Sequence, residues 1–135
     1  MSAQDPRQAS KVRTDYRDGG GFEEAAAYSR AVRIGQHVAV SGTGARGGGD
    51  AYEQTREAIS RALAGAGEVG ASKEDVLRTR LLLAEGCDWE GAIRAHAEAF
   101  AGVEPANTTY FVSGFIPDGV LVEVELDAVV AEPPR

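Results

Sequence analysis

Apolar and charged side chains alternate along residues 120–130, near the end of the chain. Such alternation predicts a β-strand with one buried face, because successive side chains of a strand point to opposite sides. We expect the apolar set to lie under helices and the acids Glu123, Glu125 and Asp127 to face away. The apolar set is Val120, Val122, Val124, Leu126, Ala128 and Val130.

Two stretches instead repeat apolar residues at intervals of three and four, which predicts amphipathic helices over 51–66 and 88–100. The first stripe is Tyr52, Thr55, Ile59, Ala62, Leu63 and Ala66, and we expect Gly65, Gly67 and Gly70 to end that helix. The second stripe is Trp89, Ala92, Ile93, His96, Ala97 and Phe100. Asp88 is the expected N-cap of the second helix, and Trp89 and His96 are expected to pack in the interior.

The remaining apolar and β-branched runs predict strands, and Gly-rich or Pro-containing segments between them predict turns and a loop. The expected strands are 12–16, 28–34, 37–41, 76–84, 107–115 and 120–130, the turns 18–21 and 117–119, and the loop 42–50. The order β-β-β-α-β-α-β-β predicts an α+β domain with both helices on one face of a single mixed sheet. We expect this domain to span 11–131, between tails at 1–10 and 132–135.

The second face of the sheet needs a cover as well. Leu82 alternates with Leu81 and Leu83, and Tyr110 alternates with Phe111, so apolar groups occur on both sides. Two helices are enough for one face only, which predicts that copies of the same chain cover the other. Arg78 and Arg80 share a face of their strand and are expected to pair with the acids of the last strand.

The composition of the chain limits the classes of molecule that it is expected to bind and indicates where it is located. The chain holds 14 Lys and Arg against 21 Asp and Glu, a formal net charge of −7, which disfavours nucleic acids and anionic lipids. Its single cysteine, Cys87, forms no disulfide within the chain, which fits a reducing cytoplasm. The polar N-terminus and the absence of an apolar run of roughly 20 residues predict neither a signal peptide nor a membrane span. We expect a cytoplasmic protein.

Several short segments in a fixed order resemble the RidA/YjgF family of reactive-intermediate deaminases. They are Tyr28-Ser29-Arg30-Ala31, Val38-Ala39-Val40-Ser41-Gly42, Gln54-Thr55-Arg56, Ser72-Lys73-Glu74-Asp75-Val76, Pro105-Ala106 and Val122-Glu123-Val124-Glu125. The resemblance implies a chorismate-mutase-like fold and a homotrimer with ligand clefts between subunits. Family members with the founding activity hydrolyse 2-imino or enamine acids to 2-oxo acids and ammonia, without a metal or organic cofactor.

The resemblance also implies site residues. Tyr28 corresponds to a cleft tyrosine, Glu123 to the acid that positions a water, and Thr109 to a position where some members carry cysteine. Thr43 stands where glutamine often follows Ser-Gly. Asn107 stands where an arginine grips the substrate carboxylate, and losing that charged fork should cost about 2–4 kcal/mol of carboxylate binding. Ordinary amino-acid imines are therefore expected to be poor substrates.

For three of these residues the sequence leaves two roles open. Arg30 either replaces the missing carboxylate grip or lies on the surface, and Glu123 either orients a water or pairs with Arg78 or Arg80 at an interface. Asn107 either binds a ligand or is a polar residue at a strand end.

Two candidate functions are consistent with these observations. The first is a small-molecule hydrolase, deaminase-like, that acts on a reactive imine, enamine or carbonyl compound, a scaffold that also suits a biosynthetic tailoring step. In it Glu123 is catalytic and Tyr28, Arg30, Asn107 and Thr109 contact the substrate. The alternative is a trimer that binds a metabolite without chemistry.

Overall fold

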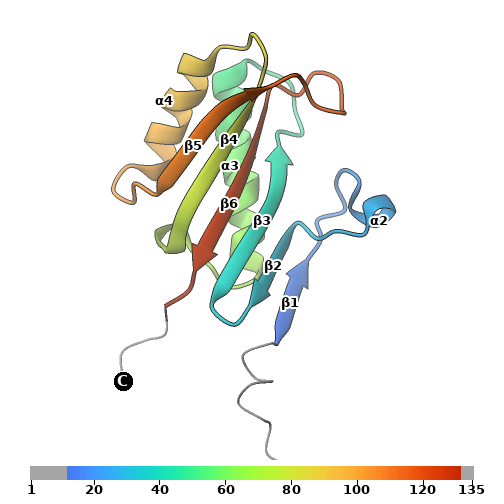
Figure 1. Cartoon of the computed structure of the whole chain (residues 1–135), viewed down its shortest axis with the longest axis vertical. Coiled ribbons are helices and arrows are strands. Elements are labelled where there is room, and N and C mark those ends of the chain that lie inside the picture. The colour runs from blue at the N-terminus through green and yellow to red at the C-terminus, as the bar shows by residue number, and fades with distance from the viewer. Residues whose placement is uncertain (1–11, 132–135) are drawn as a thin grey trace, which may run out of the picture.

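The computed structural model describes residues 12–131 and confirms the α+β class (Figure 1). The expected tails at 1–10 and 132–135 lie outside the described residues. In chain order the elements are β1 (Arg13–Tyr16), α2 (Glu23–Ala26), β2 (Ala31–Ile34), β3 (His37–Gly44), α3 (Ala51–Glu68), the 3₁₀ turn η1 (Lys73–Asp75), β4 (Val76–Ala84), α4 (Trp89–Phe100), β5 (Ala106–Val112) and β6 (Val122–Val129). The short helix α2 is an addition to the expected order.

The six strands form one sheet in the order β1-β2-β3-β6-β4-β5. Every neighbouring pair is antiparallel except β4 and β5, which run parallel because α4 crosses between them. Both long helices, α3 and α4, lie on the same face of the sheet (Figure 1). Within residues 12–131 no helix lies on the other face, as the sequence pattern indicated.

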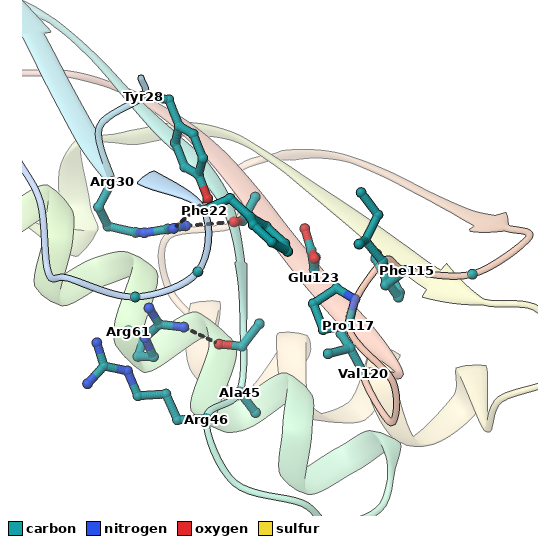
Figure 2. A pocket seen from close by; sticks show the side chains of 16 residues that line it. Phe22, Tyr28, Arg30, Ala45, Arg46, Arg61, Phe115, Pro117, Val120 and Glu123 are labelled. Atoms are coloured by element: carbon teal, nitrogen blue, oxygen red, sulfur yellow. Dashed lines mark hydrogen bonds between the residues drawn. The ribbon is translucent and has the colours of Figure 1, made fainter. Parts of the chain in front are cut away.

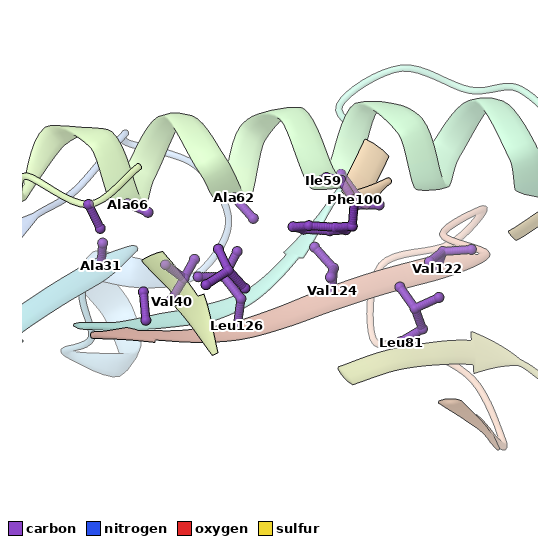
Figure 3. Packing of buried hydrophobic residues seen from close by; sticks show 14 of the residues in the cluster. Ala31, Val40, Ile59, Ala62, Ala66, Leu81, Phe100, Val122, Val124 and Leu126 are labelled. Atoms are coloured by element: carbon purple, nitrogen blue, oxygen red, sulfur yellow. The ribbon is translucent and has the colours of Figure 1, made fainter. Parts of the chain in front are cut away.

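The alternation along β6 is confirmed. Val122, Val124 and Leu126 are fully buried, and they meet Ile59 of α3 and Phe100 of α4 (Figure 3). Burying side chains of this size stabilises the fold by about 1.5–3 kcal/mol each. The core therefore fixes which face of β6 points to the helices, and it leaves Glu123 on the other face.

Helix α3 begins at a capping box, in which the Asp50 carboxylate accepts from the Glu53 amide at 2.8 Å and the Glu53 side chain reaches back to the Asp50 amide. The expectation that Gly65 and Gly67 end this helix is wrong, because α3 runs to Glu68. Gly65 is buried within the helix, and a Cβ there would lie 3.3 Å from Cγ of Arg30. The glycine therefore leaves room for the Arg30 stem.

Helix α4 is capped as expected, with the Asp88 side chain accepting from the Gly91 amide at 3.1 Å. Trp89, however, is 52% exposed, so its placement in the core is wrong. The buried positions of α4 are Gly91, Ala92, Ala95 and Phe100. A Cβ on Gly91 would lie 3.4 Å from Cβ of Tyr52, so α4 packs closely on α3 through a face rotated away from Trp89.

Several strand boundaries differ from the expected ones, and β6, expected over 120–130, runs from Val122 to Val129. β3 continues through a register shift between Val40 and Thr43 to Gly44, so the loop expected from residue 42 starts later. β2 begins at Ala31 and not at residue 28, and β5 stops at Val112 and not at residue 115. Each difference shortens or extends a strand where it meets the loops that surround the candidate site.

The open face of the sheet mixes charge and exposed apolar groups. Arg80 forms ion pairs with Glu125 at 3.6 Å and with Asp127 at 3.3 Å. The expected pairing of Arg80 with the acids of β6 is thereby confirmed. Within residues 12–131, Arg78 makes no ion pair. Leu77 is 60% exposed and lines a shallow depression of about 450 Å³ together with Ile34.

No helix in the described part of the chain is long and apolar enough to cross a membrane.

Candidate functional site

A cavity of about 560 Å³ opens at one end of the sheet. Three segments surround it: the Gly-rich turn after β1 with Phe22, the end of β3 with its following residues, and the loop from β5 to β6 (Figure 2). This volume is in the range of small-molecule sites. Arg30, Arg46 and Arg61 gather on one side of the cavity, and Glu123 lies on the other with Pro117 and Val120 (Figure 2).

Glu123 is the acid that lines this cavity from β6. Burial raises the pKa of its carboxyl, and the charge of Glu125 adds to the rise while that of Arg30 opposes it. Within the chain Arg80 pairs with Glu125 and Asp127, and the alternative pairing of Glu123 with Arg78 or Arg80 at an interface between copies stays a prediction. The carboxyl of Glu123 lies against Gly42, where a Cβ would be 2.6 Å from its Oε1.

Arg30 is 3% exposed, so the alternative of a surface arginine is wrong. Its Nε and Nη2 donate to Oε2 of Glu23 at 3.3 and 3.2 Å. Nη1 donates to the Gly42 carbonyl at 2.6 Å and to Oγ1 of Thr43 at 3.0 Å, and Nη2 also reaches Oη of Tyr28 at 3.4 Å. A guanidinium has five N–H donors, so the fold occupies all of them. Arg30 therefore organises the cavity wall.

Asp18 joins the other two arginines to this network. Its carboxylate accepts from Arg61 at 2.6 Å and lies 3.2 Å from Nη2 of Arg46. Burial by itself would raise the pKa of Asp18, but the hydrogen bond from Arg61, the interaction with the neighbouring Glu23 side chain and the hydrogen bond from the Gly20 amide outweigh it and hold that pKa well below its usual range. Asp18 therefore stays ionised and fixes the basic side of the cavity.

Tyr28 and Phe22 supply the aromatic part of the wall. The hydroxyl of Tyr28 accepts from Arg30, whose guanidinium carbon lies 5.6 Å from the centre of the Tyr28 ring. Thr43, the residue at the expected glutamine position, is fully buried and donates to the Ser41 carbonyl at 2.7 Å. Thr43 thus supports Arg30 from behind and does not line the cavity.

Gln54 of α3 holds the loop from β5 to β6, which forms the wall around Glu123. The side chain of Gln54 is 3% exposed. It donates to the Gly119 carbonyl at 3.1 Å and accepts from the Leu121 amide at 2.9 Å. The sequence marked Gln54 only as part of the family resemblance, because a buried amide in a helix has no motif of its own.

Asn107 and Thr109 lie elsewhere in the same chain. The Asn107 amide donates to Oγ1 of Thr79 at 3.1 Å and accepts from Thr109 at 2.9 Å. Thr79 is fully buried under α4 and bonds Nε2 of His96 at 2.7 Å. Both residues thus belong to the helix side of β5, the edge strand, two strands from β6.

One chain therefore brings together three of the five expected site residues: Tyr28, Arg30 and Glu123. Asp18, Phe22 and Arg46 were not anticipated, because the Gly-rich segments that carry or flank them predict turns and loops. Arg61 of α3 was not anticipated either, because it lies off the apolar stripe of its helix. His96 packs as expected, half-buried on the ring of Phe100. In residues 12–131, no three His, Cys, Asp or Glu side chains form a group that could hold a metal ion.

Comparison with known families adds the evolutionary context. The family model described as Endoribonuclease L-PSP matches residues 21–130 of the chain. An uncharacterized protein of Streptomyces coelicolor, SCO2049, is 42% identical over 116 residues, which cover 82% of this chain and 87% of that protein. A RutC family protein of Pyrococcus abyssi is 32% identical over 105 residues, covering 73% of this chain and 82% of its own.

Among solved structures, Rv2704 of Mycobacterium tuberculosis is similar over 88% of this chain and 100% of its own. The TM-score is 0.83 and the sequence identity 41%. That structure is described as a member of the YjgF/YER057c/UK114 family. The chorismate-mutase-like fold implied by the sequence is thereby confirmed.

Proposed function

Because this chain belongs to the Endoribonuclease L-PSP family, also called the YjgF or RidA family, we propose that it is a small-molecule hydrolase. Its substrate is a reactive imine, enamine or carbonyl compound bound in the cavity beside Glu123. The observation that carries this proposal is a half-buried acid with a raised pKa in a cavity of suitable size. A raised pKa means that the carboxyl holds a proton more readily, which suits a group that takes up and returns protons.

For an imine, the proposed reaction uses one water. The ionised carboxylate of Glu123 accepts a proton from the water as its oxygen attacks the C=N carbon, and the C=N electron pair moves to nitrogen. The protonated Glu123 then returns this proton to the nitrogen, which gives a carbinolamine. In a second cycle Glu123 accepts the hydroxyl proton of the carbinolamine and passes it to the amine nitrogen, the C–N bond breaks as the C=O bond forms, and ammonia leaves. The products are a carbonyl compound and ammonia, and the carboxylate is regenerated.

We further propose that the working assembly is a homotrimer, the form typical of the family. In that assembly Asn107 and Thr109 of a neighbouring copy would complete each cleft. Two features support this arrangement: both residues lie on the edge strand β5, and the face of the sheet opposite to the helices, and to these two side chains, is uncovered within residues 12–131. The neutral amide of Asn107 makes ordinary 2-imino acids poor substrates, because it offers no charged fork to their carboxylate.

A trimer that binds a metabolite without chemistry is the second candidate. It is favoured by one feature of the cavity: Glu123 is the single carboxyl among its lining residues in the described part of the chain. A binding site needs only shape and hydrogen bonds, whereas a hydrolase needs Glu123 to reach the ligand. RNA cleavage, suggested by the family description, is disfavoured by the net charge of −7.

Two variants of the full-length protein, Glu123→Gln and Asn107→Ala, separate these functions. An amino-acid oxidase would generate imines in the assay, and both imine loss and ligand affinity would be measured. Retained affinity without turnover in Glu123→Gln supports the hydrolase. Absent turnover with every ligand, together with weaker binding in Asn107→Ala, supports the binding trimer. Fast hydrolysis of ordinary imino acids that needs Glu123 but not Asn107 contradicts the proposed substrate preference.

A further inference from the structure

A continuous row of hydrogen bonds runs from helix α4 to the edge strand β5, away from the cavity. Oγ1 of Thr109 donates to Oδ1 of Asn107 at 2.9 Å, and Nδ2 of Asn107 donates to Oγ1 of Thr79 at 3.1 Å. Oγ1 of Thr79 lies 2.7 Å from Nε2 of His96. The row therefore connects an ionisable ring to a side-chain amide through a single hydroxyl group, and the residue that carries this hydroxyl is fully buried.

The donors and acceptors of each group fix the direction of these bonds. Nδ2 of Asn107 lies 3.5 Å from the carbonyl oxygen of Thr79, where the amide oxygen would be repelled. Oγ1 of Thr79 thus accepts from Asn107, and its one hydrogen remains to be donated. The acceptor that this hydroxyl reaches within residues 12–131 is Nε2 of His96. The ring of His96 is therefore the tautomer with its proton on Nδ1.

This direction requires an uncharged His96. Burial lowers the pKa of the ring, so it is uncharged at neutral pH. Two charged neighbours on α4, Arg94 and Glu98, both turn to Tyr52 of α3. The guanidinium carbon of Arg94 lies 4.5 Å from the centre of the Tyr52 ring, and Glu98 accepts from the Tyr52 hydroxyl. The cations of β4 lie toward the face of the sheet without helices: Arg78 and Arg80.

Protonation of His96 would be incompatible with the same direction. An imidazolium donates from both nitrogens, so Oγ1 of Thr79 would face two donors, and its own hydrogen would lack an acceptor in a fully buried position. A half turn of the Asn107 amide restores the row in reverse, since His96 then donates to Thr79, Thr79 to Oδ1 of Asn107, and Nδ2 to Thr109. Asn107 is exposed, so its amide can turn without repacking the core.

We propose that His96 is a positioning residue for Asn107: through Thr79, the uncharged ring holds Nδ2 of Asn107 toward β4 and Oδ1 toward Thr109, and the charged ring reverses the amide. Orientation matters for an amide because it has a donor end and an acceptor end, whereas an arginine at this position would present donors only. The effect on a ligand rests on the proposed function, in which Asn107 completes the cleft of a neighbouring copy.

Nitrogen-15 NMR of the full-length protein tests the orientation without a ligand. The chain has two histidines, so the ring signals that remain in His37→Gln belong to His96. We expect the Nδ1–H tautomer above the pKa of His96. The side-chain amide signals of Asn107, assigned by their loss in Asn107→Ala, should shift with the same midpoint as the His96 ring when the pH is lowered.

Two variants of Thr79 separate this relay from a structural role. Thr79→Val keeps the shape of the side chain but removes the hydroxyl, so His96 should still titrate while the amide signals of Asn107 no longer follow it. Thr79→Ser retains the hydroxyl and should retain the coupled shift. In the unaltered protein, an Nε2–H tautomer above the pKa of His96, or amide signals of Asn107 that do not respond to its protonation, would overturn the inference.

The consequence for binding is measured with 2-oxobutanamide, a carbonyl compound that stays neutral across this pH range. We expect its affinity to change about 10-fold across the midpoint of His96, the range of one mismatched hydrogen bond, and to stay constant in Thr79→Val. An amide that reverses without a change in affinity would uphold the role of His96 and contradict the place of Asn107 in the proposed cleft. Equal changes in Thr79→Val and in the unaltered protein would contradict that place as well.

Discussion

Oε1 of Glu123 lies so close to the backbone of Gly42 that a Cβ on residue 42 would be 2.6 Å from it. Gly42 does not have a positive φ, so space and not backbone conformation requires a glycine here. The same residue gives its carbonyl to Arg30 at 2.6 Å. The turn of β3 at Gly42 thus sets the position of both the acid and the buried arginine of the cavity.

We therefore expect Gly42→Ala to displace the carboxyl of Glu123 while the protein stays folded. A shift of about 1 Å in a proton-transfer group lowers turnover on the order of 100-fold. Steady-state kinetics together with circular dichroism would measure this. Gly48→Ala is the matched control, because nothing lies within 4 Å of a Cβ at that position. Unchanged kinetics in Gly42→Ala would show that the position of Glu123 does not matter.

The fold could be predicted because its elements depend on patterns that are local in sequence. The alternation along the strands and the helical spacing in α3 predicted the element order β-β-β-α-β-α-β-β, to which the structure adds the short α2, and the alternation along β6 predicted which of its faces the helices cover. The pattern was less informative for Trp89, because three small residues, Gly91, Ala92 and Ala95, let α4 pack on α3 with Trp89 outside. The spacing of apolar residues alone does not show which of two adjacent faces of a helix packs against its neighbouring helix.

The candidate site was harder to predict because its charges come from segments far apart in the chain. Asp18 sits in a turn and Arg46 in a Gly-rich loop, and neither segment has periodicity. Their contact depends on how β1 and β3 are joined through β2. The spacing of Arg30 from Tyr28 left open whether Arg30 lies at the cavity or on the surface, and only the structure reveals that it is buried, with Glu23 and Gly42 occupying its donors.

The stability of the protein should depend on pH through Glu123. Burial raises the pKa of this carboxyl, so between its usual and its raised pKa the folded state binds more protons than the unfolded chain. Stability contributed by this group is thus present at low pH and is lost as pH rises through the folded pKa. Glu123→Gln removes this dependence on pH. The free energy of unfolding of the variant minus that of the unaltered protein should therefore be larger at pH 7 than at pH 4.

Because Glu123 is only half-buried, the gain should stay below about 1 kcal/mol. Urea unfolding at the two pH values measures it. Glu68→Gln, at the exposed end of α3, controls for the amide substitution itself. If the gain in the free energy of unfolding of Glu123→Gln over the unaltered protein is larger at pH 4 than at pH 7, the result contradicts a raised pKa of Glu123.

Arg30 and Glu23 should be strongly coupled in folding. Both side chains are less than 5% exposed, and their atoms lie 3.2 Å apart. Arg30→Leu leaves the Glu23 carboxylate buried without its cation, a loss of about 3–5 kcal/mol in the free energy of unfolding. The double variant with Glu23→Leu should lose less than the sum of the two single losses.

The exposed pair Arg13 and Asp15, 3.5 Å apart on β1, provides the control cycle. Its coupling should be under about 1 kcal/mol, because solvent screens an exposed pair. Chemical unfolding of all the variants gives both coupling energies. Strictly additive losses at Arg30 and Glu23 would mean that the other acceptors of Arg30 hold it in place.

The uncovered face of the sheet should be where the chains associate. Leu77 is 60% exposed and lines the same depression as Ile34, Asp127 and Val129, on the face without helices. Covering a leucine side chain contributes about 1.5–3 kcal/mol. We therefore expect Leu77→Asp to dissociate the trimer, because it replaces this gain with a carboxylate beside Asp127.

Light scattering at micromolar concentration should give three times the chain mass of 14.2 kDa for the unaltered protein and a single chain mass for Leu77→Asp. Ile93→Asp, at a 39% exposed position of α4 on the helix side, is the control and should remain trimeric. The dissociated variant should also lose turnover, because Asn107 and Thr109 of a neighbour could no longer reach the cavity beside Glu123. A stable, active monomer of the unaltered protein would contradict both the interface and the role of β5 in the cleft.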